Sequence, residues 1–140
     1  MIKFSIPGEP KGKGRPKFVR STGIAFTPKD TANYENWVKC CYLETKQIKY
    51  VGNIPLGASI TAFYQIPKSA SKKDRDRMAC GAILPMKKPD ADNIVKIILD
   101  SLNGIAYDDD KQVCEVLFHK YYHEEPRVDV QIKVLVTPDI

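Results

Sequence analysis

The feature that most constrains the fold is an alternation of apolar and polar side chains near the end of the chain. The apolar series is Val128, Val130, Ile132, Val134 and Val136, and it alternates with Asp129, Gln131, Lys133 and Leu135. Successive side chains of a strand point to opposite faces of a sheet. The pattern therefore predicts a strand over residues 128–136 with one buried face and one face in water.

Three other segments have strand character. Apolar and polar residues also alternate over residues 2–6, which predicts a strand that ends at Pro7. Further strands are predicted over 58–66 and 113–122. The segment 8–18, which follows the first strand, is too rich in Gly and Pro for regular structure.

Helical periodicity marks two longer segments. A helix is predicted from about residue 28 to 48, with a start signal at Thr27 and Pro28. A second is predicted over 93–104, ended by Gly104. A short charged helix or an ordered loop is predicted over 71–79. The core stripes expected on the two long helices are Tyr34, Trp37, Val38 and Cys41 on the first and Ile94, Ile97, Ile98 and Leu102 on the second.

The element order β-α-β-α-β-β predicts an α+β fold in which a mixed β-sheet packs with helices. The chain has 140 residues, which suits a single domain over 1–140 with one hydrophobic core. An apolar fraction of 43% indicates a chain that folds.

Composition excludes several classes of protein. The four cysteines lack the Cys-x-x-Cys spacing of zinc sites, and His119 and His123 are expected to be surface or structural residues. Neither a signal peptide nor a membrane span is recognisable, so a soluble cytoplasmic protein with reduced thiols is expected. The formal charge of +5 is compatible with a polyanionic partner.

An acidic cluster stands out in this basic chain. Residues 90–110 contain six aspartates and one base, Lys96. Like charges repel, and a folded site that gathers carboxylates usually needs a cation such as Mg²⁺, whose chemistry suits phosphodiester cleavage. Asp90 and Asp92 are two residues apart and point to one side if extended. Lys96 lies one helical turn beyond Asp92, where it could contact a phosphate.

A structural explanation of the same residues remains open. Asp92 would cap the helix that begins at Asn93, Lys96 and Asp100 would form a solvated pair, and residues 108–110 would be a turn. The basic residues of the N-terminal loop are open to two explanations as well, either a solvated segment or a phosphate-binding loop. The predicted DNA contacts are Lys11, Lys13, Arg15, Lys17, Lys87 and Lys88.

The stretch KPDADNIVKIILDSLNGIAYDDDKQV, residues 88–113, resembles the central motif of the RusA family of Holliday junction resolvases, which are often found in prophages. That motif is D-x-D-N-x-x-K, a Leu-Asp-x-Leu helix, an aromatic residue, and an Asp-Asp pair before a strand. The strand that ends at Pro7 and the sequence Phe26–Thr27–Pro28 also look like the family.

The resemblance implies that Asp90, Asp92 and Asp110 are the metal-binding catalytic residues and that Lys96 is an essential basic residue. Asp110 is matched because it directly precedes Lys111–Gln112–Val113, although three consecutive aspartates leave Asp109 as the alternative. The family further implies a homodimer that cuts four-way DNA junctions by paired nicks with Mg²⁺, which Mn²⁺ could replace. Two alternatives stay open: a related nuclease for flaps or other branched DNA, and a non-catalytic DNA-binding module.

Overall fold

The computed structural model describes residues 1–14, 17–19, 21–26 and 29–136, which form a single α+β domain. Its main sheet has four strands in the order β1-β6-β4-β5, which are Ile2–Pro7, Arg127–Val134, Leu56–Gln65 and Val113–His123. The pairs β1–β6 and β6–β4 are antiparallel, and β4–β5 is parallel. The predicted mixed sheet is therefore confirmed.

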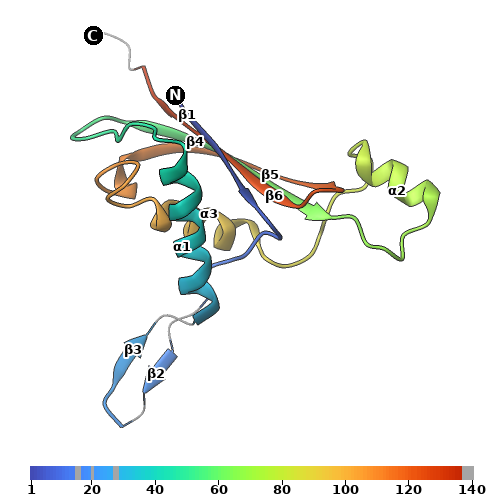
Figure 1. Cartoon of the computed structure of the whole chain (residues 1–140), viewed down its shortest axis with the longest axis horizontal. Helices are drawn as coiled ribbons and strands as arrows, with labels where there is room; N and C mark the ends of the chain where they lie inside the picture. The colour runs from blue at the N-terminus through green and yellow to red at the C-terminus, as the bar shows by residue number, and fades with distance from the viewer. Residues whose placement is uncertain (15–16, 20, 27–28, 137–140) are drawn as a thin grey trace.

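Three helices accompany this sheet. Helices α1 (Lys29–Glu44) and α3 (Ala91–Ser101) lie on the same face of the sheet, while α2 (Lys72–Ala79) lies beyond the ends of β4 and β5 (Figure 1). The small hairpin of β2 (Lys17–Val19) and β3 (Ile24–Phe26) extends from the start of α1. No helix within the described ranges is long and apolar enough to cross a bilayer.

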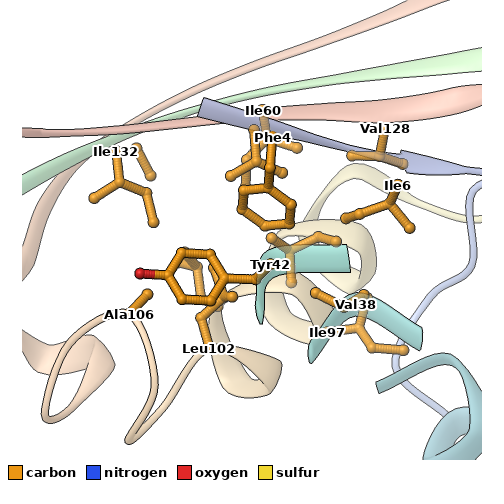
Figure 2. Close-up of a cluster of buried hydrophobic side chains, with 14 of the residues drawn as sticks. Phe4, Ile6, Val38, Tyr42, Ile60, Ile97, Leu102, Ala106, Val128 and Ile132 are labelled. Carbon is orange, nitrogen blue, oxygen red and sulfur yellow. The ribbon is translucent and has the colours of Figure 1, made fainter. Parts of the chain in front are cut away.

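The core lies between the sheet and the two long helices. Ile60, Val128 and Ile132 point from the sheet toward Val38 and Tyr42 of α1 (Figure 2). The α3 stripe is buried as predicted; Ile94, Ile97, Ile98 and Leu102 are all 0% exposed. Because these four residues bury one side of α3, the opposite side of the helix faces solvent.

Several predicted boundaries differ from the structure. Helix α1 ends at Glu44 and α3 at Ser101, earlier than predicted, and Gly104 belongs to the following turn, where its N–H donates to Tyr107 O at 2.8 Å. The N-cap of α3 is Asp90, so Asp92 lies in the first turn instead of capping the helix. The expected start signal at Thr27 and Pro28 lies outside the described residues.

Three further expectations need correction. Lys17 belongs to β2, so the predicted irregular segment 8–18 is too long at its end. Trp37 is not a core residue, since it is 44% exposed and its indole N–H donates to Pro7 O at 2.9 Å. The alternation of the last strand runs past the covered part of the sheet, because Val134 and Val136 are 44% and 95% exposed.

The two edges of the sheet differ. At the β1 edge, the side-chain amide of Gln47 accepts from Lys3 N at 2.9 Å and donates to Lys3 O at 2.6 Å. Trp37 covers the carbonyl of Pro7 on the same edge. The opposite edge is β5, whose Val116 and Leu117 side chains are 47% and 57% exposed. Side chains thus occupy backbone groups at the β1 edge, whereas the β5 edge exposes apolar side chains to solvent.

Candidate nucleic-acid-processing site

Three of the predicted site residues lie at the N-terminal end of α3. Asp90 is the N-cap, Asp92 lies in the first turn, and Lys96 follows one turn later; all three side chains are exposed. Ile94, Ile97 and Ile98 are buried in the core, so these polar groups occupy the opposite, solvent-facing side of the helix. Although Asp90 occupies the capping position, its side chain makes no capping hydrogen bond. Its carboxylate is therefore available to another partner.

Beside Asp90 the surface opens into a pocket of about 780 Å³. We call it the basic pocket; its charged and amide side chains are Lys11, Lys13, Lys87, Lys88, Glu9, Asp90 and Asn93. Four of the six predicted DNA-contacting bases therefore meet here, although the N-terminal loop and residues 87–93 are far apart in sequence. Of the other two, Arg15 lies outside the described residues and Lys17 is in β2. Such a pocket can accept a phosphate backbone.

The N-terminal loop is held against α3 by backbone contacts. Lys13 N donates to Asn93 O at 3.1 Å, and Gly14 N donates to the hydroxyl of Thr31 at 3.0 Å. A Cβ on Gly12 would lie 3.0 Å from the Cβ atoms of both Asn93 and Pro89. The loop can approach this closely because residue 12 has no side chain.

Lys13 is tied into this loop contact by its side chain as well. Its Nζ lies 2.8 Å from Glu35 and 3.4 Å from Asp100. Burial disfavours the charged ammonium, but the two carboxylates outweigh it and raise the pKa of Lys13. Asp100 thus pairs with Lys13 instead of forming the solvated pair with Lys96 that the sequence suggested. Lys13 joins the loop to both long helices, which leaves it less free than Lys11 to contact DNA.

The three consecutive aspartates have three different environments. Asp108 accepts from Gly52 N at 2.8 Å and pairs with Lys49 at 3.0 Å. Asp109 caps the short 3-10 turn Asp110–Gln112 by accepting from Lys111 N at 2.9 Å. Both interactions favour the charged form and lower the pKa of each group. Neither carboxylate is directed toward α3 by these contacts.

Asp110, in contrast, lies beside the C-terminal end of α3. Its N–H donates to Asn103 Oδ1 at 2.8 Å, and its carboxyl group hydrogen-bonds to that of Asp100. Desolvation, followed by the hydrogen bonds with Asp100 and Asp109, raises the pKa of Asp110 to about 6. Two carboxyl groups in contact must share a proton or a cation.

The predicted carboxylates therefore form two groups, one at each end of α3. Asp92 and Asp100 are eight residues apart, about 12 Å along a helix axis. In the part of the chain that the structure describes, no three His, Cys, Asp or Glu side chains are close enough to hold a metal ion together. The chemistry of the donors nevertheless fits Mg²⁺, because all are carboxylate oxygens and the Asp100–Asp110 contact is one that a cation would relieve.

The raised pKa of Asp110 leads to a prediction about stability without metal. The folded protein keeps a proton on Asp110 between the ordinary pKa of 3.8 and about 6, where the unfolded chain has lost it. The free energy of unfolding should therefore fall as pH rises through this window. We expect Asp110→Asn to melt at a higher temperature than wild type at pH 7.5 in EDTA, and the difference to vanish near pH 4.

The matched control for this prediction is Asp108→Asn. The hydrogen bond from Gly52 and the Lys49 ammonium lower the pKa of Asp108, so its charged form stabilises the fold above pH 3.8. This variant should melt at a lower temperature than wild type at pH 7.5. Melting curves across pH measure both effects, and equal shifts in the same direction would contradict the environments described for the two residues.

Tyr64, Lys120 and Tyr122 line the inner face of β4 and β5 beneath residues 87–90, and the sequence analysis did not identify them. Tyr64 donates to Pro89 O at 2.7 Å, and Lys120 Nζ donates to Lys87 O at 2.7 Å. Burial and the nearby Asp90 carboxylate raise the pKa of Tyr64 to about 12, which keeps its hydroxyl a donor. A signal existed, because Lys120 interrupts the otherwise apolar and aromatic series Val116, Phe118 and Tyr122.

An open basic pocket with free carboxylates at its rim is what a protein that binds and cuts a nucleic-acid backbone requires, and the comparisons agree with this class. The family model described as endodeoxyribonuclease RusA matches residues 7–133, so the chain belongs to the RusA family of endodeoxyribonucleases. It is also 33% identical over 135 residues to the uncharacterized protein YqaN of Bacillus subtilis (strain 168), a match that covers 94% of this chain and 95% of that protein.

Proposed function

We propose that this protein is a Mg²⁺-dependent endonuclease that cuts branched DNA and that its main substrate is the four-way junction. The observation that carries the proposal is the basic pocket, which Lys11, Lys87 and Lys88 line together with Asp90, whose carboxylate makes no capping hydrogen bond. Phosphate groups bound by these lysines would be brought next to the acidic end of α3.

In this proposal Asp90, Asp92 and Asp110 are the ligands of one or two Mg²⁺ ions, with Asp109 as the alternative to Asp110. Because the carboxylates form two groups at opposite ends of α3, Asp90 and Asp92 would hold one ion and Asp110, in contact with Asp100, would hold a second. When bound, Mg²⁺ would polarise the scissile phosphate and lower the pKa of a water molecule. Lys96, exposed one turn from Asp92, would stabilise the charge that develops on the phosphate. Asp100 contacts Asp110 and Lys13, so it would orient the carboxylate at the far end of the helix.

We further propose that the active form is a homodimer. A four-way junction has near two-fold symmetry, and two equivalent strands must be cut to separate it into duplexes. One site in one chain cuts one strand at a time, whereas two sites related by a two-fold axis can cut both. Two-fold dimers are also the commonest homo-oligomers.

A substrate panel tests the proposed function. The purified protein should cut a synthetic four-way junction with Mg²⁺ or Mn²⁺ and should be inactive in EDTA. A flap and a linear duplex of the same sequence are the controls. Preferred cutting of the flap would favour the related branched-DNA nuclease. Salt-dependent binding of all three substrates without any nicking would identify a DNA-binding module instead.

A further inference from the structure

Residues 87–90, which precede helix α3, are held by side chains of the sheet. Residues 87–90 cross the inner face of β4 and β5, where Tyr64 and Tyr122 are direct register partners and Ala62 is opposite Lys120. The two backbone carbonyls held by side chains are those of Lys87 and Pro89, two residues apart. Asp90 directly follows Pro89, so the hydrogen bond from Tyr64 to the Pro89 carbonyl also restrains the backbone of Asp90.

Lys120 supports this segment from the sheet and does not line the basic pocket. It is half-buried, its Nζ lies 5.1 Å from the centroid of the Tyr64 ring, and it is absent from the lining of the basic pocket. A lysine in this position combines a charge-assisted hydrogen bond with a cation–π contact. Both interactions favour one placement of the ammonium group.

The same tyrosines also hold the side chain of Lys87. Its Nζ lies 5.9 Å from the ring centroid of Tyr64 and 5.7 Å from that of Tyr122. Two ammonium groups therefore lie near the Tyr64 ring, that of Lys120 from β5 and that of Lys87 from the basic pocket. If Lys120 moved, both the Lys87 carbonyl and the aromatic environment of the Lys87 side chain would change.

We propose that Lys120, together with Tyr64, positions the Lys87–Asp90 segment for DNA cleavage. The inference rests on the proposed nuclease function and assigns Lys120 a role that acts through this segment. Lys120 neither touches the phosphate nor binds the metal. Its hydrogen bond to the Lys87 carbonyl keeps Lys87 and Lys88 at the basic pocket and Asp90 at the start of α3.

The first test compares Lys120→Met with Lys133→Met, which removes the same charge from the exposed face of β6. With Lys120→Met the single-turnover rate on a four-way junction should fall about tenfold or more, as expected for loss of one charged hydrogen bond. For Lys120→Met, the slope of the logarithm of the DNA-binding constant against the logarithm of salt concentration should match that of Lys133→Met. Lys120→Arg should recover much of the lost rate, because it retains the charge and the donor.

A second readout does not depend on activity. Lys87 and Lys88 are exposed, and trypsin can cut the bond between them. Mass spectrometry of timed digests should show faster cutting there in Lys120→Met than in Lys133→Met. If the wild-type protein cuts no DNA, the proposed function fails, and the digests alone then decide whether Lys120 restrains the segment.

Three results would overturn the inference. One is a cleavage rate for Lys120→Met within twofold of the Lys133→Met rate. The second is a slope of log binding constant against log salt concentration that is reduced by about one in Lys120→Met, the change expected for Lys88→Met. That result would make Lys120 a direct phosphate contact. The third is unchanged trypsin cutting. If Lys120→Met does not fold, Tyr64→Phe removes the other contact alone and should slow cleavage and speed trypsin cutting in the same way.

Discussion

Replacing Asp92 by asparagine is expected to lower the rate of DNA cleavage on the order of a thousandfold, since a catalytic metal contributes several kcal/mol to the transition state. The side chain is exposed on the solvent side of α3, so the fold should be unaffected. DNA binding should persist or become tighter, because the substitution removes a negative charge beside the basic pocket. Single-turnover cleavage and fluorescence anisotropy of a labelled junction measure the two quantities separately.

The matched control is Asp74→Asn, which removes a partly exposed carboxylate from the first turn of another helix, α2. It should cut at the wild-type rate. A wild-type rate for Asp92→Asn at saturating Mg²⁺ would rule out Asp92 as a ligand. Comparing Asp110→Asn with Asp109→Asn decides the third ligand, because Asp109 is already used as the cap of the 3-10 turn.

The largest effect on stability is expected from Ile97→Ala. Ile97 is 0% exposed and belongs to the hydrophobic core (Figure 2), so the substitution leaves a cavity there. Substitutions of this kind cost about 2–5 kcal/mol, a large part of the stability of a single domain. Urea unfolding followed by circular dichroism should show a lower midpoint with an unchanged m-value.

Ile48→Ala provides the comparison for Ile97→Ala, since it deletes the same atoms from a side chain that is 68% exposed. Its free energy of unfolding should lie within about 0.5 kcal/mol of wild type. A similar loss at both positions would mean that the substitution acts through the unfolded chain. The predicted contribution of core packing at Ile97 would then be wrong.

Local patterns predicted the fold well where they repeat. The alternation around Val130 and the helical spacing of Ile94, Ile97 and Ile98 correctly identified buried faces, because both patterns follow from backbone geometry. The patterns failed at element ends. Val134 continues the alternation but is exposed, since the covered part of the sheet does not extend that far. The β2–β3 hairpin was missed because Gly and Pro dominate the segment before it.

The candidate site could be proposed as a set of residues but not as an arrangement. The motif pointed to Asp90, Asp92 and Lys96, whose spacing along one helix is a local property. The partners of Lys13 could not be foreseen, because Glu35 and Asp100 come from two different helices and meet only in the folded chain. The same is true of Lys120, whose contact with Lys87 depends on the register of β5 beside β4.

The unequal edges of the sheet limit how copies of this chain can associate. Gln47 and Trp37 occupy backbone groups of β1, so that strand offers a poor template for a strand from another molecule. If two copies paired through β5, their sheets would join across a two-fold axis and a capped β1 would lie at both outer ends. Growth by this route would stop at two copies, so a strand-paired dimer of this chain would not extend into a fibre.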